Sequence, residues 1–156
     1  MTRQLADGSS VDLPIWVFTP GIDNMPEGAM PEGGWPVIVF VRGSAFHKQN
    51  VTDCSNYFVR IAEQGYVVDA LKYRHSDIVP FPAQMQDCKT AVRFMRKNAE
   101  RFHCNKDRIA LWGDSSGGHT VLMAGFTGNR APDTDSVALA RCVWCSIGFP
   151  IVCDLL

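Results

Sequence analysis

The segment from Trp112 to His119 reads Trp-Gly-Asp-Ser-Ser-Gly-Gly-His, which has the residue types and spacing of a serine nucleophile on a sharp turn. In the pattern Gly-x-Ser-x-Gly, Gly113 and Gly117 permit a turn so tight that a Cβ at either position would collide with neighbouring backbone. The central residue is then strained, with its hydroxyl exposed. We therefore predict Ser115 as a catalytic nucleophile. The residues of its elbow are Gly113, Asp114 and Gly117.

A serine that attacks a carbonyl group needs hydrogen-bond donors for the oxyanion that forms. The backbone N–H of Ser116 is one predicted donor, because it would begin a helix whose free N–H groups point toward the nucleophile. The other donor is expected in the loop after the apolar strand at 35–41, where small residues let the backbone approach a substrate oxygen. The candidates in this loop are Gly43, Ser44 and Ala45.

Short apolar runs alternate with helical patterns along the chain, and these elements would position the nucleophile. Strands buried in a parallel sheet are predicted at 35–41, 66–71, 108–112 and 141–147, and an edge strand at 11–19, where Pro14 removes a donor. Helices are predicted at 56–64, 83–102 and 116–126. This order predicts an α/β fold, namely a three-layer α/β/α sandwich around a mostly parallel sheet, with residues 1–156 as a single domain.

Composition and charge exclude several classes of function. The chain has 156 residues, of which 46% are hydrophobic, and 15 basic against 16 acidic residues give a net charge of −1. Because no basic run carries interleaved aromatic residues, neither nucleic acid nor a membrane surface is an expected partner. No zinc-ligand spacing and no phosphate loop is found, so we expect no metal and no cofactor.

The cysteines and the N-terminus indicate a compartment. Six cysteines are scattered through apolar or helical contexts, and Cys142 and Cys145 lie in a β-type run, which favours packing over redox chemistry. The N-terminus lacks an apolar signal region. We expect a cytoplasmic protein, although a secreted form without its leader would have the same sequence.

Taken together, these motifs resemble the α/β-hydrolase superfamily, and within it the esterase branch similar to hormone-sensitive lipase and the bacterial feruloyl and acetyl-xylan esterases. The resemblance is carried by the oxyanion loop at 35–46, by Tyr73-Arg74 and Phe81-Pro82-Ala83-Gln84, and by the elbow at 113–118. It implies a serine hydrolase that cleaves carboxylic esters through an acyl-enzyme on the nucleophile. The implied substrates are small-molecule esters, acylated carbohydrates among them.

Two departures from this family pattern bear on activity. Arg42 replaces the histidine that usually precedes the oxyanion glycines, and Ser44 and Ala45 replace glycines, which backbone donors tolerate. The second departure is that no histidine follows the acids Asp133, Asp135 and Asp154, whereas the family order is Ser, then acid, then His. We therefore expect a fold truncated and incomplete at its C-terminal side, with weak or absent turnover.

The three histidines near the predicted site are poor candidates for the missing base. His119 is expected to be carried by its helix into the packing layer, away from the nucleophilic hydroxyl. His47, in the oxyanion loop region, and His75, after the strand at 66–71, are candidates for polar contacts with the pocket.

A non-catalytic interpretation stays open beside the esterase. A truncated relative would leave the last strand, at 141–147, with unpaired N–H and C=O groups that invite pairing with another chain. Such a protein would act as a binding or dimerising module, and a homodimer formed through this edge could also supply the missing groups. A peptidase of the same fold is less favoured, because no added domain restricts access to peptides.

Overall fold

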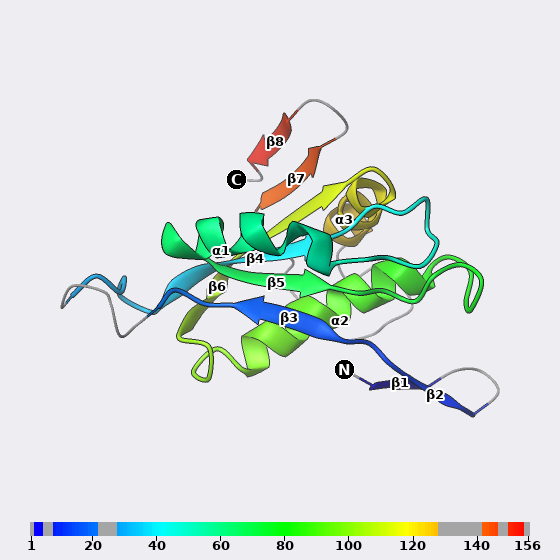
Figure 1. Cartoon of the computed structure of the whole chain (residues 1–156), viewed down its shortest axis with the longest axis horizontal. Helices are drawn as coiled ribbons and strands as arrows, with labels where there is room; N and C mark the ends of the chain where they lie inside the picture. The colour runs from blue at the N-terminus through cyan, green and yellow to red at the C-terminus, as the bar shows by residue number, and fades with distance from the viewer. Residues whose placement is uncertain (1, 5–7, 22–27, 128–141, 147–149, 155–156) are drawn as a thin grey trace.

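A computed structural model of the chain describes residues 2–4, 8–21, 28–127, 142–146 and 150–154. Its main sheet has six strands in the order β3-β5-β4-β6-β7-β8 (Figure 1). These strands are β3 (Ile15–Phe18), β4 (Trp35–Val41), β5 (Val67–Leu71), β6 (Cys104–Asp114), β7 (Cys142–Ser146) and β8 (Pro150–Asp154). The four central strands run parallel, and β3 and β8 flank them antiparallel. The predicted mostly parallel sheet is therefore confirmed.

Helices cover both faces of this sheet. They are α1 (Ser55–Glu63), which follows the short 3-10 helix η2 (Thr52–Cys54), and α2 (Ala83–Lys97) and α3 (Ser116–Thr127). Figure 1 shows α1 on one face and α2 and α3 on the other. Side chains of β4 alternate accordingly: Val39 packs in the cluster that contains α2 residues, whereas Phe40 packs with Phe58 of α1. The three-layer sandwich follows from this alternation.

The structure corrects several predicted boundaries. The strand expected at 11–19 is divided around Pro14 into β2 (Ser10–Asp12) and β3, and β2 pairs with β1 (Thr2–Gln4) in a separate two-stranded sheet. The long helix ends at Lys97 rather than at 102, because Asn98 caps it with its N–H and side-chain amide on the Phe94 carbonyl. Such local polar contacts stop a helix before its apolar pattern stops.

The expectation that the strand at 141–147 has a bare edge is wrong. β7 pairs with β6 on one side and with β8 on the other, so its backbone groups are used in both directions. The outer strands of the described sheet are β3 and β8. A dimer that pairs directly through β7 is therefore not available in this arrangement.

Two polar features lie inside the packed layers. Asp69 of β5 is fully buried, and among the described residues neither of its carboxylate oxygens has a hydrogen-bond partner. Burial raises its pKa to about 8. Arg74 and Asp87 form a buried ion pair that joins the segment after β5 to α2, with Nε and Nη2 both donating to the carboxylate. Among the described residues, the Asp69 carboxyl thus has no hydrogen-bond partner, whereas the charges of Arg74 and Asp87 are paired with each other.

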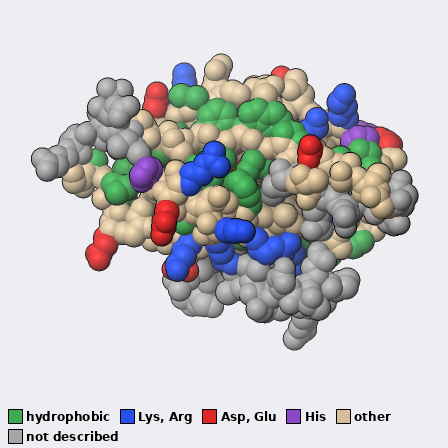
Figure 2. Space-filling model, turned by 90° about the horizontal axis from the view of Figure 1, so that it is seen from below, with side chains coloured by type: hydrophobic (Ala, Val, Ile, Leu, Met, Phe, Trp, Pro, Cys, Tyr) green, Lys and Arg blue, Asp and Glu red, His purple; other side chains and the backbone are tan. Residues whose placement is uncertain are grey.

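The surface carries charges of both signs. On the face seen in Figure 2, basic side chains gather near the centre of the lower edge and acidic side chains lie beside them. Over the described residues, no helix is long and apolar enough to cross a bilayer. Within the same ranges, the His, Cys, Asp and Glu side chains form no group of three that could hold a metal ion.

Candidate active site

Ser115 lies in the turn between β6 and α3, as the motif predicts. Its φ is 50°, a left-handed conformation that is uncommon for a residue with a side chain, and its surface is exposed. A Cβ on Gly113 would come within 2.5 Å of the Gly117 backbone, and a Cβ on Gly117 would overlap the Val41 carbonyl. The two glycines are therefore required for the turn, and the strained serine is presented at its tip.

The loop after β4 lies directly against this elbow. A Cβ on Gly43 would come within 2.8 Å of the Ser115 Cβ and would overlap the Asp114 carbonyl oxygen. Because the backbone of the loop passes so close to the nucleophile, only glycine fits at position 43. The structure thus brings the predicted oxyanion loop and the predicted nucleophile together.

Two of the candidate oxyanion donors in this loop are used within the protein. The N–H of Gly43 donates to Asp114 Oδ1 at 2.8 Å, and the N–H of Ser44 donates to Ser116 Oγ at 3.0 Å. The described residues offer no acceptor to the N–H of Ala45. Of the three candidate N–H groups in this loop, only that of Ala45 is left for a substrate oxygen, as far as the described residues show.

Arg42 and Asp114 form an ion pair that the sequence did not indicate. Arg42 Nη1 lies 3.3 Å from Asp114 Oδ2, and both side chains are about one third exposed. The same carboxylate accepts the Gly43 N–H through its other oxygen. Asp114 thereby ties the oxyanion loop to the elbow, with Arg42 at the position where the family resemblance implies a histidine.

The prediction that His119 lies in the packing layer is wrong. This side chain is exposed rather than packed inside, and its ring meets those of Phe46 and Phe81 at centroid distances of 5.6 and 6.3 Å. One helical turn past the nucleophile, the residue points to the rim of the site because α3 begins at the tip of the turn. The imidazole therefore contacts two aromatic rings while it stays exposed to solvent.

His47 and His75 both face Asp77. Their Nδ1 atoms lie 3.5 and 3.0 Å from Asp77 Oδ2, and these hydrogen bonds hold the pKa of Asp77 below its ordinary value. Within the described ranges, no side chain makes a hydrogen bond with the Ser115 hydroxyl. The side chains of Asp133, Asp135 and Asp154 lie outside the described residues.

A cavity of about 500 Å³ has Ala45 of the oxyanion loop and His119 of α3 in its lining. Its lining is mostly apolar and comes from the oxyanion loop, the segment before α2, and α2 and α3: Ala45, Phe46, Ser76, Pro80, Phe81, Gln84, His119 and Met123. Ala45 and His119 connect the cavity to the elbow. Its size falls in the range of ligand sites, so it can hold one arm of a substrate whose reacting carbon lies at Ser115.

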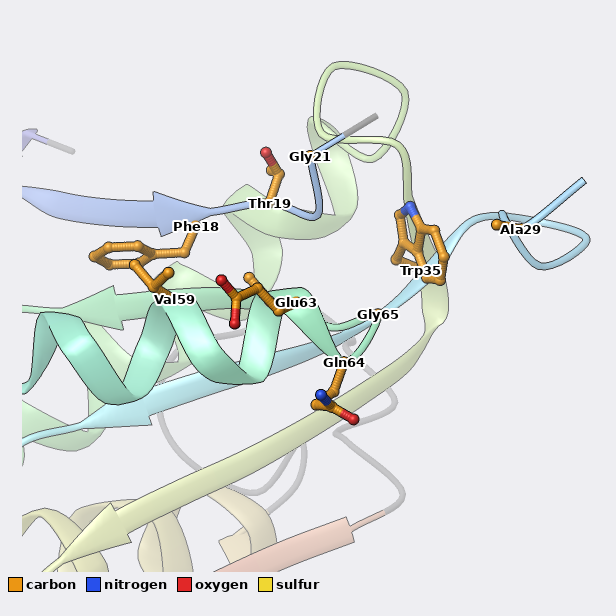
Figure 3. Close-up of a pocket in the computed structure, with 10 residues that line it drawn as sticks. Phe18, Thr19, Gly21, Ala29, Trp35, Val59, Glu63, Gln64 and Gly65 are labelled. Carbon is orange, nitrogen blue, oxygen red and sulfur yellow. The ribbon is translucent and has the colours of Figure 1, made fainter. Parts of the chain in front are cut away.

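A second cavity, of about 820 Å³, lies at the other end of the strands (Figure 3). Its lining comes from the end of β3 and the residues after it, the start of β4 and the residues before it, and the C-terminal end of α1, where Gly65 lies against the Trp35 ring. Ser115, in contrast, follows the carboxyl end of β6, which is parallel to β4. This larger cavity is therefore separate from the chemistry.

The fold, the elbow and the adjacent loop together are those of the α/β-hydrolase superfamily. Residues 25–143 match the BD-FAE family model, and the chain belongs to this family. It is 35% identical over 101 residues to Esterase LipC of Mycobacterium tuberculosis, an alignment that covers 64% of this chain and 25% of LipC.

Solved structures show the same fold. A lipase/esterase from Lactobacillus plantarum superposes with a TM-score of 0.73 at 18% identity, over 93% of this chain and 57% of that one. Brefeldin A esterase, a bacterial homologue of human hormone-sensitive lipase, superposes with a TM-score of 0.62 at 23% identity, over 88% and 36% of the two chains. The chain thus spans about a quarter of LipC and between about a third and three fifths of these structures.

Proposed function

We propose that this chain is the nucleophile-bearing part of a carboxylic ester hydrolase in which Ser115 forms an acyl-enzyme. The observation that carries the proposal is the contact between elbow and loop, which places the Gly43 backbone against the strained, exposed Ser115. A nucleophile beside a loop of small residues is the arrangement that acyl transfer requires. Family membership supports ester substrates, since relatives such as LipC are named esterases.

In the proposed reaction, Ser115 Oγ attacks the ester carbonyl carbon and the π electrons move onto the carbonyl oxygen. The N–H groups of Ala45 and Ser116 donate to this oxyanion, because the N–H groups of Gly43 and Ser44 already donate to side chains. Collapse of the intermediate breaks the bond to the alcohol oxygen, which leaves with the proton that the serine gives up. An acyl group on Ser115 results, and water releases it as the carboxylic acid.

One arm of the ester would occupy the cavity beside the nucleophile. The aromatic and apolar lining of Phe46, Phe81 and Met123 favours an uncharged, apolar group there. A carbohydrate as the alcohol portion remains a prediction from sequence resemblance. The other arm would face solvent at the exposed serine.

Turnover by this chain alone should be slow. Within the described residues, neither His47 nor His75 nor His119 makes a hydrogen bond with the Ser115 hydroxyl, so none of the three is assigned as the general base. A triad enzyme without its base keeps an acceleration of roughly 10³- to 10⁴-fold over water, through the oxyanion hole and binding. A non-catalytic binding module remains the alternative interpretation.

Hydrolysis of p-nitrophenyl acetate at high protein concentration tests the proposal. We expect a slow release of p-nitrophenolate above the buffer rate that is abolished in Ser115→Ala and retained in the control Ser10→Ala, an exposed serine at the start of β2. A rate unchanged in Ser115→Ala would refute the proposed nucleophile. A fast rate lost in Ser115→Ala but kept in His119→Ala would show that the machinery is complete.

A further inference from the structure

Three hydroxyl groups meet beneath the oxyanion loop. They belong to Ser44 in the loop, Tyr73 after β5 and Ser116 at the start of α3, and we call them the hydroxyl cluster. Tyr73 and Ser116 are only 1% and 8% exposed. Tyr73 Oη lies 3.1 Å from Ser44 Oγ and 3.5 Å from Ser116 Oγ. The cluster therefore links a loop, a strand end and a helix in the interior, beside the nucleophile.

The protons in this cluster can be assigned from donor and acceptor counts. Ser116 Oγ accepts the N–H groups of Ser44 and Phe46, at 3.0 and 3.2 Å, which uses both lone pairs of a hydroxyl oxygen. Ser44 Oγ donates to the His47 carbonyl at 2.6 Å. Tyr73 must then donate to Ser44 Oγ, and the Ser116 proton is left for Tyr73 Oη. The three hydroxyl groups thus donate in sequence: Ser116 to Tyr73, Tyr73 to Ser44, and Ser44 to the His47 carbonyl.

The Ser116 hydroxyl acts where the loop is most strained. Ala45 and Phe46 have φ values of 51° and 65°, and neither is a glycine. A left-handed conformation of this kind is unfavourable for a residue with a side chain and persists only where surrounding contacts enforce it. The two N–H groups that Ser116 Oγ accepts lie on either side of Ala45 in the chain, so one oxygen fixes both ends of the strained segment.

We propose that the Ser116 side chain is a positioning residue that holds the Ala45 N–H in the oxyanion hole. This role is separate from the oxyanion donor assigned to the Ser116 backbone, and it rests on the proposed esterase function. Without the hydroxyl, the N–H groups of Ser44 and Phe46 lose their acceptor in a half-buried position, and the segment is free to leave the left-handed region. The Ala45 N–H would then move away from the substrate oxygen.

Ser116→Ala tests the proposal with two measurements. Amide hydrogen exchange should become faster at Ser44 and Phe46, and kcat for p-nitrophenyl acetate should fall by about 10- to 100-fold with little change in KM, less than the loss of a complete oxyanion donor. Ser116→Thr keeps the hydroxyl and should restore both. The matched control is Thr120→Val, which removes another buried α3 hydroxyl, one that donates only to the Ser116 carbonyl, and it should change neither.

Tyr73→Phe provides a second variant, in which both hydrogen bonds of the tyrosine hydroxyl are lost but Ser116 Oγ still accepts both N–H groups. It should show a smaller change in exchange and rate than Ser116→Ala. Unchanged amide exchange at Ser44 and Phe46 in Ser116→Ala would overturn the proposal, and so would an unchanged kcat. If the parent chain fails to react at Ser115, the esterase function and this catalytic role fall together, while exchange still reports whether the hydroxyl fixes the loop.

Discussion

Asp69 should make the stability of this protein fall as pH rises. Its carboxyl group is fully buried in β5 between Val17 of β3 and Val39 of β4, and no residue in the described part of the chain makes a hydrogen bond with either oxygen. Burial raises its pKa from 3.8 to about 8. The folded state therefore holds the proton over a pH range in which the unfolded state has released it, and folding is penalised progressively between those two values.

The size of the effect follows from the shift. Each pKa unit corresponds to about 1.4 kcal/mol, so the full penalty above pH 8 is about 5 to 6 kcal/mol, and the part lost between pH 5 and pH 8 is about 3 to 4 kcal/mol. The neighbouring thiols do not add to this window, because burial raises the pKa of Cys88 to about 12 and also raises that of Cys104. The titration of Asp69 should dominate the difference between the parent and a variant at this position.

Urea unfolding of the parent, Asp69→Asn and Asp69→Val at pH 5 and pH 8 measures this penalty. The free energy of unfolding of the parent should drop relative to Asp69→Asn by about 3 to 4 kcal/mol between the two pH values. Asp69→Val should be more stable than the parent at both, since it also removes an unpaired polar group. Asp53→Asn, at an exposed carboxyl, should follow the parent. Parallel curves for the parent and Asp69→Asn would refute the reasoning.

Three further variants test the packing around the site. Gly43→Ala should reduce acylation of Ser115 at least tenfold, because its Cβ would lie 2.8 Å from the Ser115 Cβ; an unchanged labelling rate would contradict the contact. Arg74→Ala should lower the free energy of unfolding by about 3 to 5 kcal/mol, measured in urea, because the buried Asp87 carboxylate loses its ion pair; a loss below 1 kcal/mol would contradict this. Phe81→Ala should lower the rate with p-nitrophenyl butyrate relative to acetate by several-fold, and an unchanged ratio would place the acyl arm elsewhere.

The sequence predicted those parts of the fold that depend on local pattern. The unbroken apolar run at 35–41 and the Gly-x-Ser-x-Gly turn are local signals, and the structure has β4 and the elbow at these residues. The strands β1 and β8 were not predicted: the three residues of β1 carry too little pattern, and both strands are fixed by antiparallel pairing with a neighbour.

Predictions for the site were limited by contacts between distant residues. Asp114 was expected as part of the elbow, but its bond to the Gly43 N–H joins residues 71 positions apart. The Ser116 hydroxyl reaches Ser44 and Phe46 over similar separations. Single-sequence patterns give the residue types at such sites and not the direction in which each N–H points. The exposure of His119 likewise depends on where α3 begins relative to the loop.

The most direct test of the account is to locate the residue that a fluorophosphonate probe modifies. After prolonged incubation with excess probe, peptide mass spectrometry should find one adduct on Ser115, formed faster than at the exposed serine Ser10 and absent in Ser115→Ala. Adducts spread evenly over exposed serines, or a single adduct at any other residue, would contradict the assignment of Ser115 as the nucleophile.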